Sequence, residues 1–148
     1  MAVAEREASI HWEGDVQKGT GTMAMESSGA FGDFGVSLPT RTESPEGHTS
    51  PEELLAAAHA GCYAMAFSLV LGEAGSPPES LDAHVLATLD RAGDGFAITK
   101  IDLTVRGKVA GLDQSAFEDF AQQAEKGCPV SNALRGNVEI NLSATLDQ

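Results

Sequence analysis

Cysteine is the residue type with the most chemistry to offer in this 148-residue chain, and it occurs twice, as Cys62 and Cys128. Cys128 stands directly before Pro129, where we expect a helix to begin and its free N–H groups to favour a thiolate. Cys62 stands in the middle of an apolar run, which should raise its pKa above about 8.5. These arguments rank Cys128 as the better nucleophile. The alternative for each cysteine is a small, buried, unreactive side chain.

His59 precedes Cys62 by three residues, so the two side chains share one face of a helix. The imidazole could help to ionise the thiol or could join it as a metal ligand, whereas a packed core histidine is the alternative. Zinc needs two further ligands and usually a closely spaced pair such as C-x-x-C, which neither cysteine has. We therefore expect no metal and keep His59 as a possible auxiliary residue of a thiol site.

Two charged residues, considered separately, are further candidates for chemistry. Arg41 is one of five arginines in the chain and lies in a polar connection, residues 40–48. Glu52 and Glu53 stand at the start of the next expected helix, where Glu53 is engaged by the helix cap. Glu52 is thus the candidate functional carboxylate, and the alternative is that it only favours the helix dipole.

One long helix between Ser50 and Gly72 must position Cys62. Ser50 is the expected N-cap, and Glu53 completes an S-x-x-E capping box by reaching back to the cap. The stretch Leu54–Gly72 has no charged residue and, at about 1.5 Å per residue, is long enough to raise the possibility of a membrane span. About half of it is Ala, Gly or Ser, and no Lys/Arg cluster flanks it. We therefore expect a helix enclosed by sheet or by a second copy of the chain.

Alternating apolar and polar residues predict strands on both sides of this helix. They are expected over residues 8–13, 19–25 and 34–38 before it, and over residues 82–90, 96–109 and 138–146 after it. A bulge near Thr99 would reconcile the two halves of the fifth strand. Two further helices are expected between the last two strands, one from Asp113 to Gly127 and one from Cys128 to Leu134. This order predicts an α+β fold with mainly antiparallel sheet.

Composition limits the partners and the compartment. At 148 residues we expect one domain, residues 1–148. The formal net charge of −13 repels phosphate backbones and anionic lipids, so we expect neither nucleic acid nor a membrane as a partner. The N-terminus has no apolar core of signal-peptide length, which predicts a cytoplasmic protein. In that reducing compartment, two cysteines are expected to be reactive or metal-binding rather than a structural disulfide.

Five segments together resemble the OsmC/Ohr family of thiol-dependent hydroperoxide reductases, on the OsmC side, over nearly the whole chain. The segments are H-W-E-G-D at His11–Asp15, T-R-T-E at Thr40–Glu43, P-E-E-L-L-A-A-A-H-A-G-C at Pro51–Cys62, G-F-A-I-T-K-I at Gly95–Ile101 and G-C-P-V-S at Gly127–Ser131. Each segment alone is modest, but their order and combination are specific. One departure is Thr42, since family relatives often carry an aromatic residue after the arginine.

The resemblance implies an OsmC-like intertwined homodimer around a long central helix. It also implies a peroxidatic cysteine at Cys62, a resolving cysteine at Cys128, and an Arg41–Glu52 pair that holds the Cys62 thiolate. This overrules the ranking of the thiols given above. A guanidinium against Cys62 would restore the ionisation that burial opposes, and Glu52 would orient that guanidinium.

The implied activity is reduction of organic hydroperoxides to alcohols through a Cys62 sulfenic acid and a Cys62–Cys128 disulfide. An external thiol or dithiol would reduce that disulfide, and no cofactor is needed. Two other functions stay open. One is a peroxide-responsive redox sensor that uses the same thiols without turnover. The other is a ligand-binding dimer whose apolar groove holds a fatty molecule.

Helix geometry gives a separate expectation about assembly. Glu52 and Cys62 are ten residues apart on one helix, so their Cα atoms lie about 15 Å apart along its axis. Side chains lean toward the helix N-terminus, which turns Glu52 further from Cys62. One arginine could not comfortably contact both groups of one chain. We therefore predict an obligate homodimer in which Glu52, and with it Arg41, serves Cys62 of the partner subunit.

Overall fold

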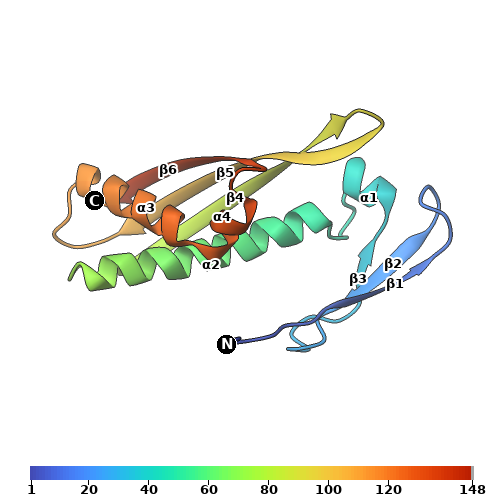
Figure 1. Ribbon diagram of the computed structural model, residues 1–148, viewed down its shortest axis with the longest axis horizontal. Coiled ribbons are helices and arrows are strands. Elements are labelled where there is room, and N and C mark those ends of the chain that lie inside the picture. Colours follow the sequence, from blue (N-terminus) through green and yellow to red (C-terminus); the bar gives the residue numbers. More distant parts are fainter. Residues whose placement is uncertain (148) are drawn as a thin grey trace. The chain divides into compact units, whose positions relative to one another are not determined.

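A computed structural model describes residues 1–147 (Figure 1). This part of the chain forms two three-stranded sheets and four helices, which confirms the predicted α+β class. It divides into two compact units. The first unit is Met1–Leu54, and the second begins at Leu55 and takes in the rest of the described chain. The single domain of residues 1–148 stays a prediction.

The first unit is a small antiparallel sheet followed by a short helix. Its elements are β1 (Ser9–Glu13), β2 (Thr20–Ala24), β3 (Phe34–Val36) and α1 (Leu38–Thr42). The strands pair in the order β1-β2-β3, with each neighbouring pair antiparallel. All three predicted strands are present, and the third ends two residues earlier than expected.

Helix α1 replaces the predicted end of the third strand and the start of the polar connection. Ser37 is its N-cap: the Ser37 Oγ accepts the Thr40 backbone N–H at 3.2 Å, and the Thr40 Oγ1 accepts the Ser37 backbone N–H at 3.1 Å. Pro39 sits in the first turn, where its missing N–H costs nothing. The prediction of a strand to Leu38 was wrong because this reciprocal cap competes with the sheet hydrogen bonds.

The second unit is built on a second sheet. The elements are α2 (Pro51–Glu73), which starts at the end of the first unit, β4 (Ser80–Ala92), β5 (Gly95–Lys108), α3 (Gln114–Gly127), α4 (Pro129–Leu134) and β6 (Glu139–Asp147). Strand β4 is antiparallel to β5, whereas β6 is parallel to β5 after the crossover through α3 and α4. The predicted bulge is confirmed. Thr88 pairs with Lys100 and Leu89 with Ile98, so Thr99 is the extra residue on β5.

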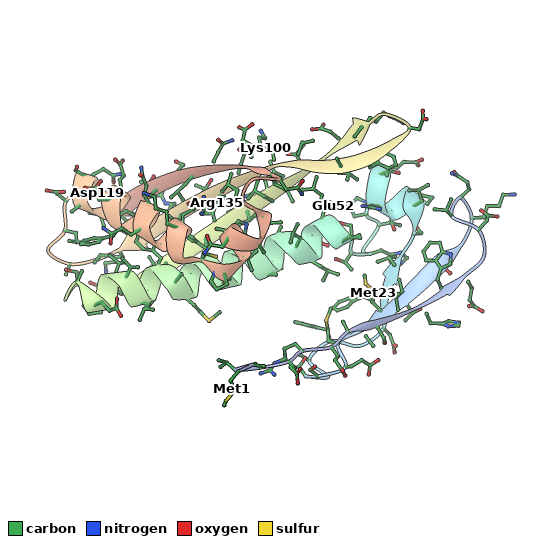
Figure 2. All side chains as sticks on the ribbon, viewed as in Figure 1. Met1, Met23, Glu52, Lys100, Asp119 and Arg135 are labelled. Atoms are coloured by element: carbon green, nitrogen blue, oxygen red, sulfur yellow. The ribbon has the colours of Figure 1, made fainter. Side chains whose placement is uncertain are left out.

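The helices of the second unit cover one face of this sheet (Figure 1). The core is made by Tyr63, Phe67 and Leu71 of α2, by Ile101, Leu103 and Val105 of β5, and by Phe117, Ala121 and Ala124 of α3. The Phe67 ring lies 5.0 Å from the Phe117 ring between centroids. Gly107 leaves room for Phe117, because a Cβ there would come within 2.6 Å of that ring. In Figure 2, Lys100 points away from the helices.

Helix α2 meets the length and composition criteria for a membrane span, but one face of it lies in this protein core. His59, Tyr63, Phe67 and Leu71 recur every four residues and are fully buried. The opposite face is exposed and consists of small and apolar residues, here called the α2 stripe: Ala57, Ala58, Gly61, Met65, Ser68, Leu69 and Gly72. Met65 is 71% exposed and Leu69 is 62% exposed. Helix α2 is therefore a core helix with one apolar face left uncovered in a single chain.

Candidate active site

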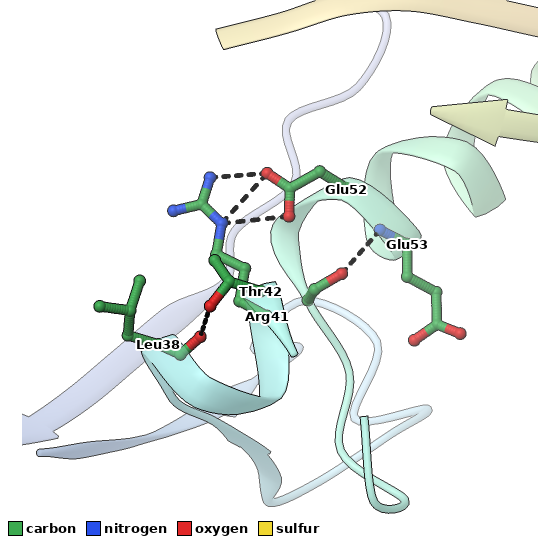
Figure 3. A network of polar contacts seen from close by, with 6 residues as sticks. Leu38, Arg41, Thr42, Glu52 and Glu53 are labelled. Atoms are coloured by element: carbon green, nitrogen blue, oxygen red, sulfur yellow. Dashed lines mark hydrogen bonds and ion pairs between the residues drawn. The ribbon is translucent and has the colours of Figure 1, made fainter. Parts of the chain in front are cut away.

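Arg41 of α1 and Glu52 of α2 form a bidentate ion pair within the first unit (Figure 3). The Arg41 Nη2 donates to Glu52 Oε1 at 2.6 Å, and the Arg41 Nε donates to Oε1 at 3.2 Å and to Oε2 at 3.1 Å. The capping box of α1 sets where Arg41 leaves the backbone, since Arg41 follows Thr40 directly. The arginine and the glutamate that the family resemblance pairs are thus in contact.

The two partners differ in exposure. The Glu52 side chain is 10% exposed, whereas that of Arg41 is 33% exposed. The hydrogen bonds that Arg41 donates to Glu52 raise the pKa of Arg41, and burial opposes this only in part. These contacts use the Nε–Nη2 edge of the guanidinium, and among residues 1–147 no hydrogen bond engages Nη1. Arg41 therefore stays charged and has a second edge that can bind an anion.

The neighbouring residue, Glu53, makes hydrogen bonds at the start of α2. Its backbone N–H donates to the Ser50 Oγ at 3.1 Å, as the predicted cap requires. Its carboxylate does not reach back to the cap, however, but accepts the Thr49 hydroxyl at 2.7 Å. That half of the predicted capping box is corrected, because Thr49 offers a hydroxyl donor one turn earlier. Thr42, the departure noted above, donates its hydroxyl to the Leu38 carbonyl at 2.9 Å and so closes α1.

Cys62 and Cys128 are neighbouring free thiols in the second unit. Cys62 lies on α2 and is partly exposed, whereas Cys128 lies between α3 and α4 and is fully buried. Both side chains belong to the same apolar cluster, and Cys128 and the Val130 backbone lie close enough to Cys62 to shift its pKa. A substrate from solvent thus has better access to Cys62 than to Cys128.

The surroundings of Cys62 favour the neutral thiol. Burial raises the pKa of Cys62 most, the Val130 N–H lowers it, and Cys128 raises it again. Cys128 is the N-cap of α4, but that helix has only six residues and no side-chain cap. The expected advantage of Cys128 at a helix start is therefore small, and its burial works against attack on a substrate.

His59 is fully buried one turn before Cys62, and its Nε2 lies 2.7 Å from the Ser131 Oγ on α4. Its Nδ1 is the one buried side-chain nitrogen or oxygen without a partner among residues 1–147. Burial lowers the pKa of His59, and Glu125 opposes this weakly. In the described residues, no group of three or more His, Cys, Asp or Glu side chains is arranged to hold a metal ion. His59 is thus a buried core histidine that is hydrogen-bonded through its Nε2.

A cavity of about 310 Å³ opens in the first unit beside Arg41. Its wall is formed mainly by apolar side chains, namely those of Ile10, Trp12, Val16, Val36, Leu38 and Pro51. Such a cavity suits an alkyl or aryl group and places one cation at its edge. This cavity was not predicted from the sequence, because its residues come from β1, the turn after it, β3, α1 and the start of α2.

Ser131 and Val130 were also missed as site residues. Both belong to the G-C-P-V-S segment that follows Gly127. The signal that could have found Ser131 is its place three residues after Cys128, on the same short helix. Its partner on α2 could not be read from the sequence, because 72 positions separate the two residues.

Comparison with known proteins gives one consistent family. Residues 44–143 match the family described as OsmC-like protein. Peroxiredoxin OsmC of Escherichia coli (strain K12) is 44% identical over 136 residues, which cover 92% of this chain and 94% of that protein. Organic hydroperoxide resistance protein OhrB of Bacillus subtilis (strain 168) is 31% identical over 111 residues, which cover 74% of this chain and 79% of that protein.

A solved structure agrees with these sequence matches. The crystal structure of an organic hydroperoxide resistance protein OsmC from Legionella pneumophila superimposes with a TM-score of 0.74 at 26% identity. The match covers 98% of this chain and 99% of that one. By the family match, the two curated relatives and the shared fold, this chain belongs to the OsmC-like protein family.

Proposed function

We propose that this protein is a cysteine-based peroxidase that reduces organic hydroperoxides to alcohols. The observation that carries the proposal is the pair of free thiols, with the partly exposed Cys62 beside the fully buried Cys128. Relatives named peroxiredoxin OsmC and organic hydroperoxide resistance protein OhrB support the same chemistry. The cytoplasmic location and the external reductant stay predictions.

The reaction has three steps. The Cys62 thiolate attacks the distal peroxide oxygen, so that an S–O bond forms, the O–O bond breaks, and the departing alkoxide takes a proton to become the alcohol. The sulfur of Cys128 then attacks the Cys62 sulfenic acid, so that an S–S bond forms and water leaves. An external thiol or dithiol supplies two electrons and returns both cysteines to thiols.

The first step needs a thiolate, and burial of Cys62 opposes one. In our proposal Arg41 supplies the missing positive charge through the guanidinium edge that Glu52 leaves free. The cavity beside Arg41 takes the organic group of the substrate. Hydroperoxides with an alkyl or aryl group should therefore react better than hydrogen peroxide.

The active unit in this proposal is a homodimer. Glu52 and Cys62 lie ten residues apart on the continuous helix α2, which is about 15 Å along the helix axis. The α2 stripe is exposed in a single chain and rich in small residues, so two copies of α2 could cross closely there. Two antiparallel α2 helices would bring the charged pair of each subunit toward Cys62 of the partner subunit.

The test is a peroxidase assay with cumene hydroperoxide and dithiothreitol on the wild type, Cys62→Ser and Cys128→Ser. We expect turnover in the wild type and none in Cys62→Ser. Cys128→Ser should reduce about one equivalent of peroxide and then over-oxidise, because no thiol resolves its sulfenic acid. If both variants fail equally to reduce the first equivalent of peroxide, the assigned roles of the two cysteines are wrong.

The same assay separates the other two functions. A redox sensor would form the Cys62–Cys128 disulfide once but would not consume peroxide catalytically with dithiothreitol. A ligand-binding dimer would form no disulfide after one equivalent of hydroperoxide. Comparable efficiency for hydrogen peroxide and cumene hydroperoxide would reject the preference for organic substrates.

A further inference from the structure

One buried hydrogen bond joins the two segments that carry the cysteines. It runs between the Nε2 of His59 on α2 and the Oγ of Ser131 on α4, at 2.7 Å, and both residues are fully buried. His59 precedes Cys62 by three residues, and Ser131 follows Cys128 by three residues. The reaction proposed above uses neither side chain.

The segment around Cys128 needs such a link. Cys128 itself has extended backbone, with φ −70° and ψ 119°, between two helices. Arg135 donates to the Glu125 carboxylate at 2.8 Å, which joins the two ends of residues 125–135 to each other and not to α2. Apart from the contacts of Cys62, the His59–Ser131 bond is the one hydrogen bond between residues 125–135 and α2 in the part of the chain described.

Disulfide formation makes strict demands on this link. The two sulfurs must reach about 2.05 Å, with Cβ atoms about 3.8 Å apart, so a small shift of either segment prevents the bond. The attack on a hydroperoxide makes no such demand, because the peroxide diffuses to Cys62. Loss of the link should therefore slow the second step and spare the first.

We infer that His59 and Ser131 are positioning residues of the resolving step. Their hydrogen bond holds the Cys128 segment against Cys62, so that the sulfenic acid condenses with Cys128 before a second hydroperoxide oxidises it further. In this step an S–S bond forms, the S–O bond of the sulfenic acid breaks, and the Cys128 proton leaves with the hydroxyl group as water. The inference rests on the proposed function.

The experiment uses the reduced full-length protein mixed rapidly with one equivalent of cumene hydroperoxide. Peroxide loss, disulfide formation and, at excess peroxide, Cys62 sulfinic acid are followed in the wild type, His59→Leu and Ser131→Ala. We expect peroxide loss within about threefold of the wild type, and disulfide formation slower by about 10- to 100-fold, as for other misplaced reacting groups. Cys62 sulfinic acid should rise in both variants.

Conservative variants test whether the bond itself matters. Ser131→Thr keeps a hydroxyl group, and His59→Gln keeps a polar group near the Nε2 position, so both should recover part of the disulfide rate. The double variant His59→Leu/Ser131→Ala should lose no more than the worse single variant, since both changes break one bond. Recovery and non-additivity would attribute the effect to this one bond, and its restriction to the disulfide step would distinguish positioning from a general loss of structure.

The outcomes separate the inference from the function on which it rests. A wild-type protein that neither consumes hydroperoxide nor forms a disulfide rejects the proposed function. A competent wild type with equally fast disulfide formation in Ser131→Ala and His59→Leu rejects the inference alone. Equal slowing of both steps in these variants also rejects it, because that is the mark of general loss of structure. If His59→Leu does not fold, the same measurements on Ser131→Ala and Ser131→Thr test the inference.

Discussion

The Arg41–Glu52 pair and the Cys62–Cys128 pair are held in place by different means. The charged pair belongs to the first unit, rests on a five-residue helix, and has an arginine side chain that is 33% exposed. The thiol pair belongs to the second unit and lies against a core of aromatic and aliphatic side chains. The first arrangement keeps a charge in contact with water, whereas the second buries Cys128 completely and Cys62 in part. Peroxide chemistry needs both, since burial alone favours the unreactive thiol.

The largest expected effect comes from removing the charge. Arg41→Ala should lower the rate of the first reaction with cumene hydroperoxide by about 100-fold or more, the size of loss seen when a preorganised charged or polar donor is removed. Arg41→Lys should recover only part of it, because lysine lacks the fork that pairs with Glu52 on one edge and an anion on the other. The measurement is single-turnover peroxide loss.

Arg106→Ala is the matched control for the charge. Arg106 also pairs with a carboxylate, that of Asp147, but lies on the exposed face of the second sheet. Its loss should leave the peroxide reaction within about twofold of the wild type. Equal losses for Arg41→Ala and Arg106→Ala would mean that only the overall charge of the protein matters.

Removing a side chain from the core of the second unit should lower the stability of the protein. Phe67→Ala removes a fully buried ring that packs on Tyr63 and Phe117, and should lower the free energy of unfolding by about 3–5 kcal/mol. Urea denaturation at a fixed protein concentration measures this. Met65→Ala, two residues away on the α2 stripe, should lower it by much less but weaken the dimer. A similar decrease in the free energy of unfolding for Phe67→Ala and Met65→Ala would contradict the assignment of one buried and one exposed face to α2.

The pH dependence of Cys62 sharpens the link between the two pairs. Burial raises the pKa of this thiol, and only the thiolate reacts, so its rate rises with pH until the pH passes that pKa. If Arg41 opposes the effect of burial, the midpoint for iodoacetamide modification of Cys62 lies at lower pH in the wild type than in Arg41→Ala. Coincident pH profiles would show that the guanidinium does not act on this thiol.

The smallest expected effect concerns acid stability. The pKa of His59 is lowered by burial in the folded protein, whereas in the unfolded chain it is about 6.5. Below a pH of about 6.5 the unfolded state therefore binds more protons than the folded state. The contribution of His59 to the free energy of unfolding is fully present above this pH and is lost as the pH falls toward the lower pKa of the folded state. His59→Gln should lose part of this dependence, measured as melting temperature against pH, whereas the exposed His84→Gln should keep it.

Much of the fold was predictable because local patterns and tertiary structure agree. The β5 alternation, with Ile101, Leu103 and Val105 facing the core, follows from the period of a strand, and the change of parity before it required the bulge at Thr99. The cap at Asp113 is as expected, with its side chain accepting the Ala116 N–H at 2.8 Å.

The features that were not predictable depend on competition between two local patterns or on contacts between residues far apart in the chain. The S-L-P-T sequence at Ser37–Thr40 is both the end of a strand pattern and a capping box, and the cap prevails. The parallel pairing of β6 with β5 follows from the path of α3 and α4, which residue alternation does not contain. In the candidate site, residue type and position selected Cys62, Cys128, Arg41 and Glu52 as candidates, but their roles and the pairing of Arg41 with Glu52 came only from the family resemblance. Ser131 needed the three-dimensional structure.

If the charged pair of one subunit activates Cys62 of the partner subunit, two inactive variants should complement each other in a mixed dimer. Glu52→Ala and Cys62→Ser proteins, each inactive alone, are mixed in equal amounts, dissociated and reassembled. Half of the re-formed dimers should be mixed, and each mixed dimer should contain one complete site, so the activity should return to about one quarter of the wild type. If mixed dimers are verified and stay inactive while wild-type protein survives the same treatment, Glu52 serves its own chain and the claim is contradicted.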